Sequence, residues 1–414
     1  MYKPQYGRLL LFACAAAICA GCQSAPAAQP QAAVLPGIEV WLTTDIGDLA
    51  GKRIGLMTNH TGLTRAGEST IDVLRRDSRI KLTTLFAVEH GLRGTADAGA
   101  RVVSGVDEKS GLPVHSLYNA EGNYRPTIQM MREIDVVMFD IQDIGTRYYT
   151  YVWNMIMAME VAAELRRPFV ILDRPNPIGG ELVQGRLRDR RDHVGLYPVT
   201  IRHGLTPGEL ARWVNGEFRV GADLRVIPVQ GWQRSMWWEA TGIPWVPPSP
   251  NMPSVESATH YPGTCLFEGT NLSVGRGTPM AFQQIGAAWL DAEELARRLT
   301  AKNLPGVRIE AVTFTPQNAG DGKFNGRQVN GLRFHATDRK QYDPTVTAIH
   351  TLVELRRLHG DSLRFSVAHF DRLAGSTNVR EQITAGTSAE RITADWGAQV
   401  ADFRRSREKY LLYR

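Results

Sequence analysis

The sequence predicts an α/β fold, with a parallel β-sheet flanked by helices, followed by a smaller α+β domain. Between residues 53 and 229, short apolar runs typical of strands alternate with segments of helical periodicity. This alternation is typical of a parallel sheet covered by helices on both faces. At 414 residues and 43% hydrophobic content, the chain is long enough for two domains with full cores.

The elements of the first domain follow one another closely. Strands are expected at 53–59, 81–88, 134–141, 168–173 and 223–229, and helices at 69–77, 149–166 and 208–218. From about residue 233 the chain is rich in aromatic residues and proline and shows neither period, so a long ordered loop is expected there. Beyond it, amphipathic helices are expected at 291–303 and 345–360, and half-exposed strands at 308–314 and 329–337.

The N-terminus has the composition of an export signal. Basic residues precede the apolar run "LLLFACAAAICAGC", which ends at Cys22 and is too short to span a bilayer comfortably. The end of this run resembles a bacterial lipoprotein box with Cys22 as the lipidated residue, although Cys19 stands where leucine is usual, and cleavage after Ala27 is the alternative. We therefore expect a signal at 1–22, a flexible tether at 23–36, and an exported protein anchored to the outer membrane, since Gln23 follows the cysteine.

The cysteines and charges limit the possible partners. Cys14 and Cys19 leave with the signal and Cys22 carries the lipid, so that Cys265 alone is left in the folded part and no intramolecular disulfide is expected. The 48 basic and 42 acidic residues give a net charge of +6, but lysine and arginine are scattered. This distribution argues against a nucleic-acid partner.

Polar residues gather where the expected strands of the sheet end. In an open parallel sheet, ligands bind outside the carboxyl ends of the strands. Four expected strands run into "TNHTG", "EHGLRG", "DIQDIGTRYY" and "DRPNPIGG". Any one of these residues could be a helix cap, a structural ion pair or a core side chain, but their coincidence in four loops favours a binding cleft. The predicted cleft residues are Asn59, His60, Glu89, His90, Arg93, Asp140, Asp143, Arg147, Tyr148, Tyr151, Asp173, Arg174 and Asn176.

Several common chemistries do not match the sequence. "GLTRAGES" has the glycine spacing of a phosphate loop, but Glu68 stands where lysine is required. There is no dinucleotide-binding glycine pattern, no nucleophile elbow and no zinc-ligand spacing. His60, His90 and Asp143 are the conceivable metal ligands, but neither a metal nor another cofactor is expected.

The remaining possibility is a saccharide site in an exported protein. Carboxylates and amides bind sugar hydroxyls, and aromatic rings pack against the apolar faces of sugars. Cleavage of a glycosidic bond needs a protonated carboxylic acid at the leaving oxygen and, in most enzymes, a second carboxylate. Glu89 is the best acid, because the apolar run before it would partly desolvate the carboxyl group and favour its protonated form. The structural alternative is a Glu89–Arg93 ion pair.

Together these motifs resemble the bacterial exo-β-N-acetylmuramidases, a family long catalogued as a domain of unknown function. The resemblance runs from about residue 38 to 414 and includes "GLMTNHTG", "EHGLRG", "DIQDIGTRYYTY", "LDRPNPIGG", "RHGLTPGELA", "PPSPNMPS", "YPGTCLFEGTNLSVGRGTP" and "KYLLY". It implies release of terminal N-acetylmuramic acid from the non-reducing end of peptidoglycan fragments. It also implies a Rossmann-like domain, here 37–255, and a smaller domain, here 256–414, with the site between them.

The resemblance also suggests roles for individual residues. Glu89 corresponds to the family's acid, and the second-domain motif contributes Glu268, Asn271 and Arg276. The second catalytic group is Asp143, Glu268, Asp140 or the substrate's own acetamido group. Asn251 of "PPSPNMPS" is a further predicted substrate contact.

Two other functions fit the same residues. One is a glycosidase for another N-acetylated amino sugar such as N-acetylglucosamine, and the other is a non-catalytic, cell-wall-binding lipoprotein. The lactyl carboxylate of muramic acid requires a cation, for which Arg147, Arg202 and Arg276 are the candidates, and Arg276 is preferred because small residues flank it. A binding protein would need the aromatic and arginine side chains but no acid.

Overall fold

The computed structural model describes Met1 and residues 33–94, 96, 99–118 and 124–414. The expected signal, Cys22 and the first ten tether residues lie outside the described residues. Ala33–Arg414 form one compact unit. Within the described part of the chain, no helix combines the length and apolarity needed to cross a membrane.

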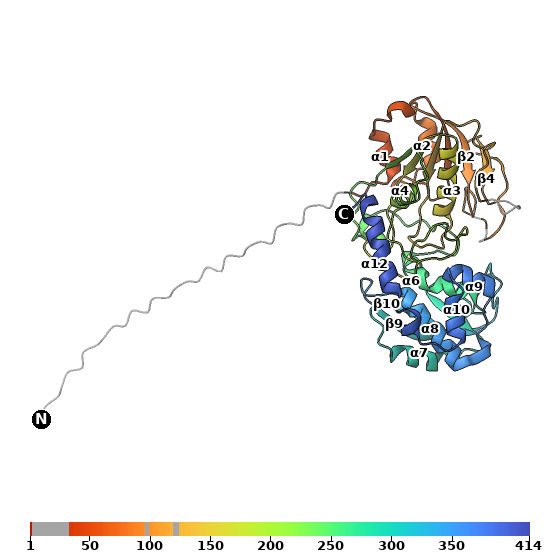
Figure 1. Cartoon of the computed structure of the whole chain (residues 1–414), viewed down its shortest axis with the longest axis vertical. Helices are drawn as coiled ribbons and strands as arrows, with labels where there is room; N and C mark the ends of the chain where they lie inside the picture. The colour runs from red at the N-terminus through yellow and green to blue at the C-terminus, as the bar shows by residue number, and fades with distance from the viewer. Residues whose placement is uncertain (2–32, 95, 97–98, 119–123) are drawn as a thin grey trace. The chain divides into compact units, whose positions relative to one another are not determined.

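A seven-stranded sheet forms the first half of the compact unit (Figure 1). The strand order is β3-β4-β2-β1-β5-β6-β7, and every pairing is parallel except that of β3 with β4. All five predicted strands are confirmed, whereas β3 and β4 are too short to give a periodic pattern. The bounds are β1 (Arg53–Thr58), β2 (Lys81–Ala87), β3 (Gly105–Val106), β4 (Pro113–Ser116), β5 (Val136–Asp140), β6 (Phe169–Leu172) and β7 (Leu224–Ile227).

Helices cover both faces of this sheet, as predicted. Side chains alternate along each strand, so Val137 and Phe139 join the core beneath α3 (Tyr151–Glu164) and α4 (Pro207–Glu217). Val136 and Met138 join the opposite core, beneath α1 (Gly37–Thr43) and α2 (Thr70–Arg76). The 3₁₀ turn η1 (Gly47–Leu49) follows α1. A capping box between Thr206 and Glu209 begins α4.

The region from residue 233 to 254 is the expected ordered loop. It contains a single helical turn, α5 (Trp238–Thr241). Two main-chain carbonyls fasten its far end to the sheet half: Pro247 O contacts His60 Nε2 at 2.8 Å, and Pro248 O accepts a 2.6 Å hydrogen bond from the Tyr151 hydroxyl.

The second half is built on a three-stranded antiparallel sheet, of order β8-β10-β9. The predicted strands and helices correspond to β9, β10, α7 and α8, and the remaining elements were not predicted. The bounds are α6 (Val255–Thr264), η2 (Cys265–Gly269), β8 (Gln284–Ala287), α7 (Ala292–Thr300), β9 (Val307–Phe314), β10 (Val329–Ala336), α8 (Pro344–His359), η3 (Gly360–Ser362), α9 (Val367–Ala374), α10 (Asn378–Thr384), α11 (Ala389–Ile392), α12 (Trp396–Arg407) and η4 (Glu408–Tyr410).

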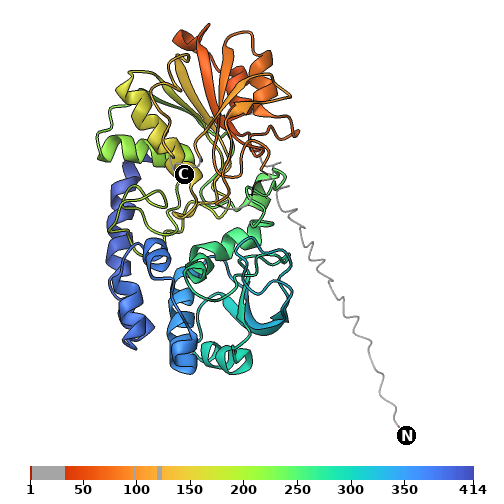
Figure 2. The same cartoon turned by 90° about the vertical axis from the view of Figure 1, so that its right-hand side faces the viewer.

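The end of the chain returns to the sheet half, where α12 lies beside it (Figure 2). Arg407 Nη1 donates hydrogen bonds to the carbonyls of His203 and Gly204, at 2.8 and 2.6 Å. The Tyr413 hydroxyl donates to Asp173 Oδ2 at 2.6 Å, at the end of β6. The C-terminal residues therefore bind the two halves together.

Candidate active site

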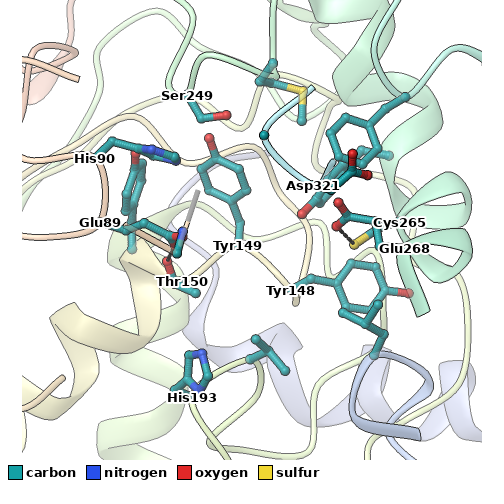
Figure 3. Close-up of a pocket in the computed structure, with 18 of the residues that line it drawn as sticks. Glu89, His90, Tyr148, Tyr149, Thr150, His193, Ser249, Cys265, Glu268 and Asp321 are labelled. Atoms are coloured by element: carbon teal, nitrogen blue, oxygen red, sulfur yellow. Dashed lines mark hydrogen bonds between the residues drawn. The ribbon is translucent and has the colours of Figure 1, made fainter. Parts of the chain in front are cut away.

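A cavity of about 310 Å³ lies between the two halves (Figure 3). One part of its wall comes from the carboxyl edge of the large sheet and includes Glu89, His90 and the segment 148–151. The other part comes from η2, the loops around Arg276 and Asp321, and α9. The cavity therefore lies where the strand-end argument places a ligand.

Glu89 projects into this cavity from the turn after β2. The turn is tight, with left-handed φ angles of 67° at His90 and 72° at Gly91. Thr150 Oγ1 donates a 2.8 Å hydrogen bond to Glu89 Oε2, and Gly99 N donates one of 3.0 Å to Oε1. The alternative ion pair is not formed, because Arg93 Nη2 lies 2.5 Å from Asp107 Oδ1.

Glu268 lies across the cavity from Glu89, with the ring of Tyr149 between them in Figure 3. Two nitrogens of Arg276 approach Glu268 Oε1, Nε at 2.7 Å and Nη2 at 2.6 Å. Burial alone would lower the pKa of Arg276, but the charge of Glu268 and its hydrogen bond raise it. Lys323 holds the turn beneath them, since its Nζ donates to the carbonyls of Glu268, Thr270 and Leu272 at 2.8 to 3.1 Å.

Aromatic rings form much of the remaining wall. Tyr149 packs edge-on against Tyr151 and Tyr261, with ring centroids 5.0 and 6.0 Å apart. Tyr148 and Tyr151 do not share a helix face, because α3 begins only at Tyr151 and Tyr148 precedes it. Both tyrosines nevertheless line the cavity. The Tyr148 hydroxyl donates to the carbonyl of Pro262 at 3.2 Å.

The structure places Asp143 and Asp140 outside the cavity wall. Asp143 is buried, and its Oδ2 accepts a 2.7 Å hydrogen bond from Gly145 N while Oδ1 has no partner among the described residues. Burial raises the pKa of Asp143 to about 7. Asp140 is enclosed by Arg174 and Thr70, both of which bind its carboxylate. Asp140 ends β5 and Asp143 follows it by three residues, and neither lines the cavity.

Three other predicted residues organise the loops at the sheet edge. Asp173 accepts hydrogen bonds from Thr206 Oγ1 and Gly208 N at the start of α4, at 2.7 and 2.8 Å. Asn176 donates to the carbonyl of Leu205 at 3.0 Å. Asn59 Oδ1 accepts from the Thr61 hydroxyl at 2.6 Å. Each is occupied in holding a loop and lies outside the wall.

The remaining predicted contacts also lie outside the wall. They include two of the three arginines that were predicted to bind the lactyl carboxylate, so that prediction is corrected for both. Arg147 and Arg202 are fully buried, and burial lowers their pKa values to about 10 and about 9. Arg202 Nη1 donates to Gln184 Oε1 at 3.1 Å. Asn271 holds the segment 362–364 through its amide. The predicted residues outside the wall are Asn59, His60, Arg93, Asp140, Asp143, Arg147, Asp173, Arg174, Asn176, Arg202, Asn251 and Asn271.

Sequence reasoning missed several residues of the wall. Tyr149 and Thr150 stand within the predicted "DIQDIGTRYYTY" motif, and Ser249 within "PPSPNMPS", so those motifs carried a usable signal. Tyr118, His193, Asp321, His369 and Arg372 follow no predicted strand. Among the residues that the structure describes, no group of three or more His, Cys, Asp and Glu side chains is placed to hold a metal ion.

Comparison with known proteins identifies the family. Residues 54–256 match the model of the exo-β-N-acetylmuramidase NamZ N-terminal family, and residues 259–413 match that of the corresponding C-terminal family. The chain belongs to the NamZ family. The division between the two NamZ models falls close to the predicted domain boundary at 255/256.

Similar proteins include one named for its activity and two with solved structures. Peptidoglycan β-N-acetylmuramidase NamZ of Bacillus subtilis (strain 168) is 42% identical over 397 residues, which cover 94% of this chain and 95% of that protein. Two crystal structures of DUF1343 family proteins from Bacteroides fragilis have the same fold. One is 35% identical with a TM-score of 0.85, covering 93% of this chain and 100% of that one; the other is 32% identical with a TM-score of 0.72, covering 92% and 99%.

Proposed function

We propose that this protein is an exo-β-N-acetylmuramidase that hydrolyses the bond after a terminal N-acetylmuramic acid at the non-reducing end of peptidoglycan fragments. The observation that carries the proposal is the placement of Glu89 and Glu268 in one cavity, on opposite sides of an aromatic wall. Two carboxyl groups on either side of a sugar are what glycoside cleavage uses in most families. Membership of the NamZ family supports the same reaction and substrate class.

Glu89 is the proposed general acid. Its carboxyl group is held from two directions, by the Thr150 hydroxyl and by Gly99 N. A fixed orientation matters because a proton donor must lie within hydrogen-bond reach of the leaving oxygen. Neither of these contacts supplies a positive charge.

Glu268 is the proposed second carboxylate. Among the three protein groups predicted for this role, Glu268 is in the cavity wall, whereas Asp140 and Asp143 lie beneath it. Arg276 contacts its Oε1 through two nitrogens and so holds the carboxylate in place. A negative group there stabilises the positive charge that develops on the sugar ring in the transition state.

The aromatic side chains suit a disaccharide in this space. Tyr118 and Tyr124 lie 5.2 Å apart between ring centroids, and Tyr124 stacks on His193 at 4.3 Å. Tyr118 and His193 line the cavity near Glu89. Such rings can pack against the apolar faces of sugars, and we propose a muramic acid–N-acetylglucosamine disaccharide as the minimal substrate.

The proposal is tested with purified protein lacking residues 1–32, because Val34 is buried and Leu35 pairs with Gln230. Incubation with a chromogenic β-N-acetylmuramide and with defined peptidoglycan disaccharides should release free N-acetylmuramic acid, identified by mass spectrometry. Cleavage only of the corresponding N-acetylglucosaminide would assign the site to another amino sugar. Binding of the disaccharide without turnover would instead indicate a cell-wall-binding protein.

We further propose export and lipid anchoring at Cys22. The support is the sequence pattern of residues 1–22 followed by a tether rich in proline, alanine and glutamine. Expression of the full chain and of Cys22→Ser in a Gram-negative host tests this. The parent should fractionate with the outer membrane and carry lipid, and Cys22→Ser should lose the lipid. Equal fractionation of both, without lipid on either, would favour cleavage after Ala27.

A further inference from the structure

Arg372 is an arginine of the cavity wall that has no acidic partner among the residues that the structure describes. It lies on α9, and among the described residues no carboxylate lies within 4.0 Å of its guanidinium nitrogens. Its one side-chain hydrogen bond is a long one, 3.4 Å from Nη2 to Nδ1 of His369. Its Nε is buried without a partner. A half-buried guanidinium left in this state is suited to a ligand that brings its own negative charge.

The other arginine of the wall is already engaged. Arg276 contacts Glu268 through two nitrogens at 2.6 and 2.7 Å. Binding a ligand carboxylate there would require competition with a carboxylate of the protein itself. Arg147 and Arg202 are buried outside the wall, so none of the three arginines that the sequence suggested is available.

The surroundings of Arg372 are built to hold it in place. Its main-chain carbonyl accepts a 2.8 Å hydrogen bond from Arg188 Nη1, and the carbonyl of Leu373 accepts one of 2.7 Å from Arg147 Nη2. The buried guanidinium groups of Arg188 and Arg147 therefore bind the C-terminal end of α9, where the helix dipole is negative. Arg147 and Arg188 thus connect the sheet half to the helix that carries Arg372.

The charged neighbours of Arg372 leave its positive charge available. His193 and His369 both line the cavity. Burial lowers the pKa of each imidazole, and the charge of Arg372 lowers it further. Both rings are therefore neutral at pH 7, and neither carries a negative charge that would neutralise the guanidinium group.

We propose that Arg372 binds the lactyl carboxylate of the terminal muramic acid and makes the site selective for muramic acid over N-acetylglucosamine. This inference rests on the proposed function. The two sugars differ by the lactyl ether, which only muramic acid has. Its carboxylate supplies the negative charge that Arg372 lacks as a partner in the cavity. A guanidinium fork binds a carboxylate through two parallel hydrogen bonds, which gives orientation as well as affinity.

The test compares ligands with and without the charge. Binding of N-acetylmuramic acid, its lactyl methyl ester and N-acetylglucosamine is measured by calorimetry on the parent, Arg372→Gln, Arg372→Lys and Arg364→Gln. Arg364 precedes α9, is exposed and lies outside the cavity wall, so its substitution matches the charge change. The activity of each variant on a chromogenic muramide is measured in parallel.

Arg372→Gln should weaken the binding of N-acetylmuramic acid about ten- to hundredfold and change the binding of the ester less than about threefold. Arg372→Lys should fall between, because it keeps the charge and loses the fork, and Arg364→Gln should match the parent. Equal losses on acid and ester, or no loss on either, would overturn the role of Arg372 while parent turnover of the muramide leaves the proposed function standing. A parent that neither binds nor cleaves the muramic acid compounds would overturn both.

Discussion

Thr150 Oγ1 donates a 2.8 Å hydrogen bond to Glu89 Oε2 and so joins the residue before α3 to the turn after β2. The two residues are 61 positions apart in sequence. The contact fixes one oxygen of the proposed acid and leaves the side chain in the cavity wall. Four predictions test the site built around it.

Glu89→Gln should reduce turnover of a disaccharide at least about a hundredfold, because the amide has no proton to transfer to the leaving oxygen. The loss should be smaller for a nitrophenyl glycoside, whose leaving group departs more easily without protonation. Steady-state kinetics on both substrates, with a melting curve as the control for folding, measure this. Near-parent turnover of the disaccharide would mean that Glu89 is not the acid.

Thr150→Val should lower kcat/KM about tenfold, since it removes the donor to Glu89 Oε2 while preserving side-chain shape. Thr150→Ser is the matched control, because it keeps the hydroxyl and should retain most of the activity. Equal activity of the valine and serine variants would show that the hydrogen bond does not position the acid.

Arg276→Gln should impair muramide and N-acetylglucosaminide turnover to the same degree, because Arg276 holds Glu268 and does not read the lactyl group. The melting temperature should also fall, because a half-buried carboxylate then lacks its partner. The free energy of unfolding should drop by about 3 kcal/mol. The double variant Glu268→Gln/Arg276→Gln should recover part of this stability. Selective loss on the muramide would restore Arg276 as the lactyl contact.

Asp143→Asn should have a large effect on how stability depends on pH and a small effect on activity. The folded carboxyl has a pKa of about 7 against an ordinary value of 3.8, so the native state binds more protons between these values and loses stability as pH rises through them. The free energy of unfolding lost over this pH range is on the order of 4 kcal/mol at most. The melting temperature of the parent should therefore fall more between pH 4.5 and 8 than that of the variant.

The activity of the same variant separates structure from catalysis. Because Asp143 lies outside the cavity wall, kcat/KM for the muramide should change by less than about tenfold. A loss of a hundredfold or more with an unchanged fold would make Asp143, and not Glu268, the second catalytic carboxylate.

The sequence by itself determined the sheet, the strand-end position of the site and the proposed acid. These follow from local patterns: buried runs such as Val136–Asp140 form strands, and a carboxylate directly after a strand, such as Glu89, must lie at the sheet edge. Whether Glu89 pairs with Arg93 could not be decided locally, and Asp107 settles that choice through an ion pair with Arg93.

Only the tertiary structure decided which polar residues face the cavity. Asp140 ends β5 and Glu89 follows β2 at the same sheet edge, but Arg174 and Thr70 enclose Asp140 while Glu89 lines the cavity. Arg372 gave no signal in the sequence, because its position depends on α9 docking through Arg147, 225 positions earlier in the chain. Long-range packing of that kind leaves no periodic pattern in the sequence, and it pairs Arg276 with Glu268 while no carboxylate of the described residues pairs with Arg372.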